Sequence, residues 1–385
     1  MMIKLLCIDP LENYDIIDVD ILRVHGIETV FASKLPPKIN AKINHTIDSF
    51  AYEDIYALCE LIRPDYITCL SEELFVTVAK IRSELGIKGM SLSKAMLLSH
   101  KNVMYEQLNG LFPYPKTTTI SESSSFSLLT TELNSREIFI KPINMAGSCE
   151  TYHVKNSSDF QLFLSNQKAG LANYIAQAYI EAELYHSELA IFNGEILFIS
   201  ARRYSLPNHL MVSSNEPIFS LNITDKEKHK KIIDASIKVK ELLKINNAIL
   251  HTEFFLSDND DLNFIETNAR APGIGLNRMY QKKLSISLET LLCFIVCGVA
   301  PPKIAEQCSH YICGYYPLKH GVVKNIDIPS LDVESEWITY VKPNDSFVQA
   351  KRMTKSAMVI CWAKSSKKIE EVSGVLSKHD LIQVY

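Results

Sequence analysis

Hydrophobic and polar residues form blocks along the first ninety or so residues, and the blocks predict strands and helices in turn. The runs at 3–9, 27–33 and 66–70 are short and mostly apolar, as is typical of strands buried on both faces. The segments 14–26 and 51–65 carry apolar residues at helical spacing. Strands that alternate with helices indicate a parallel, doubly wound sheet. That architecture by itself says nothing about chemistry.

The pattern changes after these residues. Residues 91–120 predict a pair of helices and then a proline-marked crossing into new structure, and the Ser/Thr-rich segment 117–131 predicts a polar connection or domain boundary. Further along, most apolar runs predict strands, including a hairpin that turns at Asn193-Gly194. Residues 225–245 predict a long amphipathic helix. We expect an α/β protein, α+β when taken as a whole, with two or three domains, because 385 residues exceed one compact core.

Composition and charge narrow the choice of function. The formal charge is −4 and the pI is about 6.3, so the chain offers no broad basic surface to nucleic acid or anionic lipid. The longest apolar run, near 288–300, is shorter than the roughly 20 residues that cross a bilayer, and the first residues lack the apolar stretch of a signal peptide. Nine cysteines without a CxxC pair, with Cys293 and Cys297 on one expected buried helix face, indicate reduced thiols. We therefore expect a cytoplasmic protein that binds neither nucleic acid nor membranes.

Two acidic strands late in the chain carry the most informative pattern. Glu253 lies in HTEFFL and Glu266 in FIETNAR, on either side of an acidic turn, so the two strands are expected to pair antiparallel. Alternation places Glu266, Asn268 and Arg270 on one face of their strand. Carboxylate and amide oxygens suit Mg²⁺, and an arginine fork matches phosphate. The pattern predicts a metal and phosphate site; an exposed hairpin with a solvated polar face is the alternative.

A lysine followed by a loop gives a second, weaker signal. Lys141 ends the apolar run IFIK, and the loop after it contains Gly147 and Ser148. Backbone N–H groups of such a loop can surround a phosphate while the lysine neutralises its charge, although a plain loop after a strand explains the same residues. No G-x-x-x-x-G-K-[ST] segment occurs, and the G-x-G that begins at Gly273 lacks the third glycine of a dinucleotide fingerprint.

The segment 174–192 gives a third signal. Its apolar residues alternate with Gln177 and Glu183, so a strand is expected to run into a turn. An adenine edge needs one main-chain donor, one main-chain acceptor and an apolar slot, which a strand-to-turn hinge can supply. An ordinary edge strand explains the segment equally well when it is considered alone.

Taken in order, these segments resemble the ATP-grasp superfamily over roughly residues 90–300. The resemblance rests on Lys101 in a helix–loop, Lys141-Pro142 with its loop, the hinge at 177–183, Glu253, and E-x-N-x-R at 266–270. NARAPG and the tail from 311 are most similar to the L-amino-acid ligases, in the branch that also holds biotin carboxylase and D-alanine–D-alanine ligase.

The resemblance implies an ATP-grasp fold with an N-terminal doubly wound parallel-sheet domain, a central ATP-binding lid and a C-terminal mixed-sheet lobe. The implied boundaries are 1–95 for the first domain, 96–310 for the ATP-grasp domain with its lid at about 117–185, and 311–385 for the small lobe.

The resemblance also implies a role for each matching residue. The ATP phosphates would be bound by Lys101, Lys141 and the loop 144–149 with Gly147 and Ser148. Adenine would be held by Gln177, Tyr179 and Ile180, and the ribose by Glu183 or Glu188. Two Mg²⁺ ions, with Mn²⁺ as an alternative, would be ligated by Glu253, Glu266 and Asn268. Arg270 would stabilise the acyl phosphate and the tetrahedral intermediate.

Four positions depart from the family's usual pattern. Gln177 and Ala182 stand where relatives have the hinge acid and hinge glycine. His100 replaces the acid that often precedes the first lysine, and Ala269 replaces the proline common before Arg270. None of these changes removes a metal ligand, so activity is expected to survive, while the adenine and ribose contacts stay open.

The implied reaction activates a carboxylate as an acyl phosphate and passes it to an amine, with release of ADP and phosphate. The partners would be small-molecule acids and amines, and a homodimer is implied because relatives are commonly dimers. Candidate substrate contacts are Arg202, Arg203, His209, His251 and Gly273, although an arginine pair at a strand end is more often solvated and a lone histidine more often packed. The alternatives are biotin-carboxylase-like activation of bicarbonate and a non-catalytic ATP-binding regulatory protein.

Overall fold

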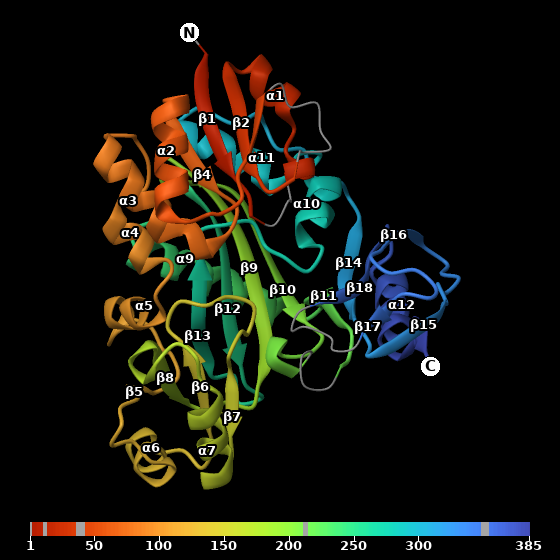
Figure 1. Ribbon diagram of the computed structural model, residues 1–385. Helices are drawn as coiled ribbons and strands as arrows, with labels where there is room; N and C mark the ends of the chain where they lie inside the picture. The colour runs from red at the N-terminus through yellow and green to blue at the C-terminus, as the bar shows by residue number, and fades with distance from the viewer. Residues whose placement is uncertain (1, 11–13, 36–42, 211–214, 348–353) are drawn as a thin grey trace.

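The chain forms a mixed α/β structure around one large sheet. The computed structural model describes residues 2–10, 14–35, 43–210, 215–347 and 354–385. Within them lie sheets of four, eight, three and four strands. Figure 1 shows the eight-stranded sheet in the middle, with the N-terminal domain above it, a small lobe (117–178, here called the lid) below it, and the C-terminal strands to the right. The predicted α/β class is confirmed.

The N-terminal domain is the parallel sheet that the first ninety residues predicted. Its order is β3-β2-β1-β4, and all neighbouring strands run parallel. Leu6 and Ile8 pack with α2 and α3 on one face, and Leu5 and Cys7 pack with α1 and α11 on the other, so β1 is buried on both sides. The elements are β1 (Ile3–Ile8), α1 (Val19–Val24), β2 (Ile27–Ser33), β3 (Ile43–Thr46), α2 (Tyr52–Ile62), β4 (Tyr66–Cys69) and α3 (Phe75–Leu85).

The central sheet is antiparallel throughout, in the order β13-β12-β9-β10-β11-β14-β18-β16. The predicted hairpin of β9 and β10 turns at Asn193 and Gly194, whose φ angles of 51° and 86° suit a two-residue turn. Its strands are β9 (Glu183–Phe192), β10 (Glu195–Tyr204), β11 (Ile218–Asn222), β12 (Ala248–Leu256), β13 (Leu262–Asn268), β14 (His310–Pro317), β16 (Glu334–Thr339) and β18 (Lys355–Ala363).

The C-terminal residues continue this sheet, because β14, β18 and β16 are three of its eight strands. A smaller sheet of β15 (Gly321–Ile326), β17 (Ser346–Phe347) and β19 (Ile382–Val384) lies beside them, and α12 (Ser366–Lys378) packs on β14 and β18. The expected boundary at 310/311 therefore falls where a strand joins the main sheet. The domain boundaries stay a prediction.

The lid is a separate four-stranded sheet with two helices on it. It consists of β5 (Thr117–Thr119), α6 (Phe126–Leu133), β6 (Ile138–Pro142), β7 (Tyr152–Val154), α7 (Ser157–Asn166) and β8 (Tyr174–Ala178). Of the two alternatives for 117–131, a plain polar connection is wrong, since β5 and most of α6 occupy the segment, and a domain boundary stays a prediction. Ser125 caps α6 by accepting a hydrogen bond from the Leu128 backbone N–H, and Leu129 is buried in the lid core. Packing in the lid core therefore stabilises a helix in a segment whose composition is polar.

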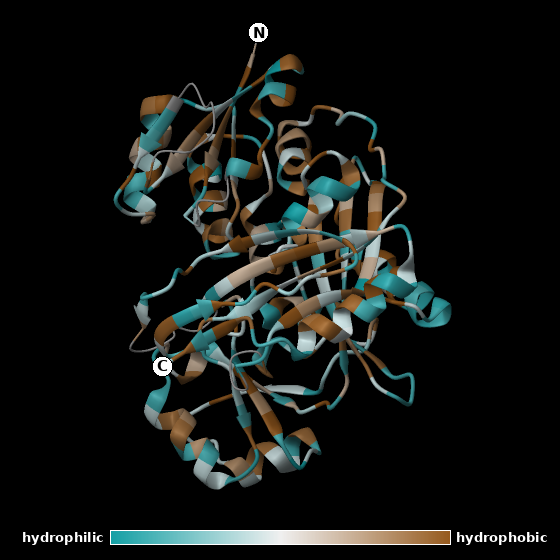
Figure 2. Ribbon diagram, turned by 90° about the vertical axis from the view of Figure 1, so that its right-hand side faces the viewer, coloured by the Kyte–Doolittle hydropathy of each residue, from teal (hydrophilic) through white to brown (hydrophobic). Residues whose placement is uncertain are grey.

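The remaining helices surround the main sheet. They are α4 (Leu92–Leu97), α5 (Lys101–Leu108), α9 (Lys226–Leu242), α10 (Leu276–Leu284) and α11 (Leu288–Cys297). Helix α9 confirms the predicted amphipathic helix, and Figure 2 shows polar and apolar residues alternating along the outer helices. The expected helix at 14–26 is two short pieces, a 3₁₀ turn (Tyr14–Ile16) and α1. Among the described residues no helix combines the length and apolarity needed to cross a membrane.

The contact between β11 and β14 leads to a stability prediction. A Cβ added at Gly314 would lie 2.2 Å from the Ile218 carbonyl oxygen and 2.3 Å from a ring carbon of Phe219. Gly314→Ala should therefore lower the free energy of unfolding by about 1–3 kcal/mol, because backbone must move. Urea denaturation measures this. Gly374→Ala, at an open position inside α12, is the control and should raise stability by about 0.5–1 kcal/mol. Equal stability of the Gly314 variant and the parent would contradict this strand contact.

Candidate active site

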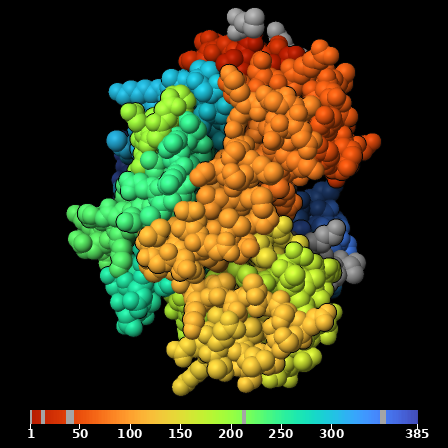
Figure 3. Space-filling view, turned by 90° about the vertical axis from the view of Figure 1, so that its left-hand side faces the viewer, coloured from red at the N-terminus to blue at the C-terminus, as the bar shows by residue number. Residues whose placement is uncertain are grey.

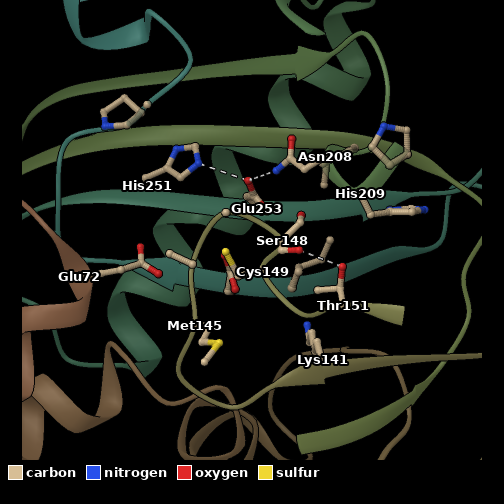
Figure 4. A pocket seen from close by; sticks show the side chains of 18 of the residues that line it. Glu72, Lys141, Met145, Ser148, Cys149, Thr151, Asn208, His209, His251 and Glu253 are labelled. Carbon is tan, nitrogen blue, oxygen red and sulfur yellow. Dashed lines mark hydrogen bonds and ion pairs between the residues drawn. The ribbon is translucent and has the colours of Figure 1, made fainter. Parts of the chain in front are cut away.

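A cavity of about 560 Å³ lies where three parts of the chain meet. Its walls come from the lid strands β6 and β8 with the loop 145–149, from β12 and β13, and from the segment 70–73 that follows β4. Figure 4 shows side chains from these parts around a common space, and Figure 3 shows the lid as a lower lobe distinct from the N-terminal domain. The segment after β4 is the carboxyl end of a parallel strand, which is where ligands bind in such sheets.

Most of the residues predicted from the sequence line this cavity. They are Lys101, Lys141, Gly147, Ser148, Gln177, Tyr179, Ile180, His209, His251, Glu253, Glu266, Arg270 and Gly273. Asn268 is buried beside them, with its Nδ2 3.4 Å from Oε1 of Glu266. Glu183, Glu188, Arg202 and Arg203 are not part of the cavity wall among the described residues.

The two acidic strands pair as predicted, and their register brings the carboxylates together. Glu253 lies directly opposite Glu266, and His251 opposite Asn268. Opposed residues of an antiparallel pair point to the same face, so both carboxylates face the cavity. Oε1 of Glu253 accepts hydrogen bonds from Nδ2 of Asn208 at 3.0 Å and lies 3.4 Å from Nε2 of His251. The polar face is therefore inside the cavity, not solvated as in the alternative.

Lys101 offsets the charge of one of these acids. It begins α5, and its Nζ lies 2.9 Å from Oε2 of Glu266 and donates to the Met145 carbonyl at the same distance. Burial would raise the pKa of Glu266, but the charges of Lys101 and Lys141 lower it to about 2. Burial likewise opposes the charge of Lys101, and Glu266 raises the pKa of this lysine above its ordinary value. The pair is thus ionised, and it ties the loop after β6 to the acidic strands.

Lys141 lies on the opposite wall, in β6, without such compensation. Its Nζ donates to the Tyr105 hydroxyl at 3.0 Å, and that hydroxyl donates to the Ile265 carbonyl. Among the described residues it forms no ion pair within 4 Å, and it is 5% exposed. Burial and the charge of Lys101 lower its pKa to about 7. An anion in the cavity would restore its full charge, so Lys141 is suited to a phosphate group.

Arg270 links the acidic strands to the N-terminal domain. It lies just after β13, and its Nε donates to Oε2 of Glu72 at 2.7 Å. Burial opposes the charge of Arg270, whereas Glu72 raises its pKa. The sequence analysis did not single out Glu72. The available signal was its place at the carboxyl end of a parallel strand.

The predicted adenine residues follow one another at the lid side of the cavity. Gln177 is buried in β8 and donates from Nε2 to Oγ1 of Thr117 at 2.7 Å. Tyr179 stacks on His153 with 3.8 Å between the ring centroids, and Ile180 comes next along the wall. Apolar residues complete the slot: Pro115, Phe139, Leu184, Phe255 and Ile265. This arrangement offers main-chain groups at a strand end beside apolar surface.

The two arginines that were predicted to contact the substrate instead bind other residues of the protein. Arg202 is 4% exposed and donates to Ser220, Asn222 and the Tyr311 carbonyl. Arg203 pairs with Glu183, which also meets Lys228 at 3.4 Å and the Tyr185 hydroxyl. Both arginines fasten strands of the sheet, and the partner of Arg203 is the acid predicted for the ribose. Period-two alternation in the sequence does not tell which face of β10 the cavity adjoins.

Glu188 belongs to a buried network behind the cavity wall. Its carboxylate accepts from Nδ1 of His186 at 2.7 Å, from Nδ1 of His251 at 2.9 Å, and from the Tyr280 hydroxyl, all in the interior. Burial would raise the pKa of Glu188, but the two histidines lower it well below the ordinary value. Hydrogen bonds to Glu188 and Glu253 raise the pKa of His251 to about 9, against the effect of burial. Glu188 therefore orients His251, which in turn contacts Glu253.

The segment after β10 adds one residue that the sequence did not single out. Asn208 donates to Glu253, and this contact appears as a dashed line in Figure 4. Its neighbour His209 lines the cavity 5.0 Å from the Phe139 ring, and burial together with His153 lowers its pKa to about 4. His209 is neutral at ordinary pH, so a role in holding a substrate carboxylate by charge is not supported by its surroundings.

Comparisons with known proteins relate this geometry to one group of enzymes. No family model matches the chain. It is 25% identical over 281 residues to the L-arginine-specific L-amino acid ligase of Bacillus subtilis, covering 68% of this chain and 64% of that protein. It is 23% identical over 296 residues to an alanine–anticapsin ligase of Bacillus subtilis (strain 168), covering 69% and 62%. The chain thus matches less than two thirds of the length of either relative.

Solved structures extend the similarity over the whole chain. The L-amino acid ligase from Bacillus licheniformis superposes with a TM-score of 0.76 at 14% identity, covering 100% of this chain and 99% of that one. The N5-carboxyaminoimidazole synthetase from Staphylococcus aureus, complexed with ADP, superposes with a TM-score of 0.73 at 13% identity, covering 98% of each chain. In its fold the chain is similar to these solved ligase structures, and in its sequence it is similar to amino-acid ligases.

Proposed function

We propose that this protein is an ATP-dependent carboxylate–amine ligase of the amino-acid or peptide ligase type. One observation carries the proposal: the opposed carboxylates Glu253 and Glu266 share a cavity with Lys101, Lys141 and Arg270. Acids that ligate Mg²⁺, facing cations that bind phosphate, form the arrangement that phosphoryl transfer requires. The names of its sequence relatives support the same conclusion.

The donor set fits magnesium. Glu253 and Glu266 offer hard oxygens on one face, and Asn268, whose Nδ2 donates to Glu266, would add its amide oxygen. Mg²⁺ binds well through a few protein oxygens completed by phosphate and water. Bound there with ATP, Mg²⁺ would neutralise the phosphate charge; two ions, with Mn²⁺ as a substitute, belong to the proposal.

The lysines and the lid loop would position the phosphates. Lys141 gains a full positive charge when an anion approaches, and Lys101 can share its ammonium group between Glu266 and a phosphate oxygen. The loop 144–149, with Gly147 and Ser148, follows β6 and lines the cavity. Lys101 already holds this loop through the Met145 carbonyl. Closure of the loop would keep water from hydrolysing an acyl phosphate.

The chemical logic explains why a carboxylate needs ATP. A carboxylate is a poor electrophile, since its leaving group would be oxide. Transfer of the γ-phosphoryl group makes phosphate the leaving group, and an amine then attacks the acyl carbon. Arg270 would stabilise the negative charge that develops on the reacting oxygens, and Glu72 holds its guanidinium in place.

Adenine would bind at the lid end, between Gln177 and Ile180. The Gln177 carbonyl stands where relatives have an acid, and its amide is held by Thr117. The Tyr179 and Ile180 main chain would meet the adenine edge. Glu183 stays the candidate for ribose; it would have to share its carboxylate with Arg203. The boundaries 1–95, 96–310 and 311–385, a homodimer and a cytoplasmic location complete the proposal.

The experiment measures the release of ADP and phosphate from ATP in the presence of Mg²⁺ and an amino-acid library. The amino acids are added singly and in pairs, and the products are identified by mass spectrometry. Turnover that requires an acid and an amine together, with an amide as product, supports the ligase. Turnover that requires bicarbonate instead supports a biotin-carboxylase-like enzyme. ATP binding without release in any mixture supports a regulatory protein, and either of these results contradicts the ligase.

Glu266→Gln tests the metal site. Glutamine keeps the shape and one acceptor for Lys101 but removes the charge that a divalent ion needs, so kcat should fall by about 10²–10³-fold. ATP turnover measured against Mg²⁺ concentration checks this. Glu195→Gln, at an exposed position of β10, is the matched control and should behave like the parent. Unchanged turnover at low Mg²⁺ would show that Glu266 is not a ligand.

Arg270→Lys tests the role of the arginine in the chemical step. The variant keeps a cation but loses the planar fork, so kcat should fall by about 10²-fold while KM for ATP changes little. Arg136→Lys makes the same change at an exposed position that does not line the cavity, and it serves as the control. A rise in KM for ATP with kcat preserved would instead assign Arg270 to nucleotide binding.

A further inference from the structure

A buried acid that the proposed mechanism does not use lines the same cavity. Glu289 is in the first turn of α11 and is 4% exposed. Its Oε2 atom is buried and has no hydrogen-bond partner in the part of the chain that the structure describes. The Asn277 side chain hydrogen-bonds the carboxyl group. A buried carboxylate oxygen without a hydrogen bond destabilises the folded protein, so a ligand that bonds to this oxygen would explain why an acid occupies the position.

Helix capping does not supply the explanation. The N-terminus of α11 is capped by Ser287, whose Oγ accepts from the Thr290 backbone N–H at 3.0 Å. An acid in the first turn is also favoured by the helix dipole, but an exposed position would give that benefit without the cost of burial. Glu289 is instead directed to the cavity wall.

Two charged residues act on Glu289 with opposite signs, Asp9 and Arg278. Asp9, at the end of β1, is fully buried, and its charge acts on Glu289. Arg278 is the nearby cation, but its NH2 lies 2.6 Å from Oδ2 of Asp15. Burial raises the pKa of Glu289 to about 7, and the charge of Asp9 acts in the same direction. A positively charged ligand would offset the charge of Glu289 and would satisfy its Oε2 atom.

The position of Glu289 separates it from the adenine end. Helix α11 packs on β1 and β4 of the N-terminal domain, whereas Gln177 and Ile180 belong to the lid side. Figure 1 shows α11 in the upper half of the molecule and the lid strands at the bottom. Arg270 comes from the end of β13, and its partner Glu72 follows β4. Glu289 therefore lies away from the end of the cavity at which adenine is proposed to bind.

We propose that Glu289 binds a cationic nitrogen of the acid substrate, an ammonium or a guanidinium group, and so selects amino acids over simple carboxylic acids. This rests on the proposed ligase function and names its substrate class. Asn277 orients the carboxylate, and Asp9 adds negative charge behind it. The two sources of the cation, the α-amino group and a basic side chain, share this chemistry.

The test compares Glu289→Gln with the parent in binding and in turnover. Calorimetry with ADP and Mg²⁺ present uses L-alanine against propionate, which differ in the α-amino group, and L-arginine against L-citrulline, which differ in the side-chain charge. The dissociation constant and KM of the cationic member should rise about tenfold to hundredfold in the variant, and those of the neutral partner should not. The pair that responds identifies which nitrogen is bound. Equal values for Glu289→Gln and the parent would overturn the proposal.

A stability measurement gives a second readout that does not depend on activity. The folded pKa of Glu289 lies above its unfolded value of 4.5, so the folded protein keeps a proton that the unfolded chain has lost, and stability falls as pH rises from 4.5 through about 7. The groups that face it are Asp9, Asn277 and Arg278. Without substrate, Glu289→Gln should therefore melt higher than the parent at pH 8 and should lose part of this pH dependence. A variant that melts lower at every pH would assign Glu289 a structural role and overturn the proposal.

Glu73→Gln is the matched control. Glu73 lines the same cavity but is exposed, so its loss removes the same charge without removing a buried contact. It should leave the affinity ratio of each pair unchanged; a shift equal to that of Glu289→Gln would show a long-range field effect and overturn the proposal. Amino-acid binding at Glu289 without any ATP turnover would support this inference while contradicting the ligase, so the two can fail separately.

Discussion

The balance of buried charge in the cavity is the constraint on which the rest of the site depends. The register of β12 and β13 puts Glu253 and Glu266 side by side on one face. Two neighbouring carboxylates repel each other, and removing both from water makes the repulsion stronger. Lys101 offsets Glu266, while Asn208 and His251 donate hydrogen bonds to Glu253. Both acids are thus compensated within the protein, and an ion bound at Glu266 would share its oxygens with Lys101 and Asn268.

This constraint also explains why the cavity needs three parts of the chain. Lys101 begins a helix after the N-terminal domain, Lys141 belongs to the lid, and Arg270 is fixed by Glu72 at the end of a parallel strand. Three cations placed close together on one helix or strand would repel one another. Lys101 and Arg270 each have an acidic partner, whereas Lys141 has only the Tyr105 hydroxyl, so the proposed phosphates would supply its counter-charge.

The sequence could predict the acidic pair because its cause is local. Alternation along two strands joined by a short turn determines which side chains share a face, and Glu253 with Glu266 follow directly. Glu72 escaped prediction because its contact with Arg270 joins residues 198 positions apart. The hydrogen bond from Tyr280 to buried Glu188 also joins residues that are far apart in the sequence. Helix α6 likewise depends on packing in the lid core. The pattern of polar and apolar residues shows which side chains share a face of a strand. It does not show which residues from distant parts of the chain pack over them.

The two ends of the cavity differ in how far their residues can be predicted from local sequence patterns, and this difference bears on substrate specificity. The side proposed for phosphate and adenine includes the lid strands β6 and β8, so its features follow from short sequence motifs. The acid at the start of α11 acts through burial beside Asp9, a residue from the first strand, and through Asn277 of the preceding helix. Such a contact can change with packing while the motifs stay the same. Enzymes of one fold can therefore keep a common phosphoryl-transfer site and differ in substrate, and in this chain Glu289 is the residue at which that difference is expected to reside.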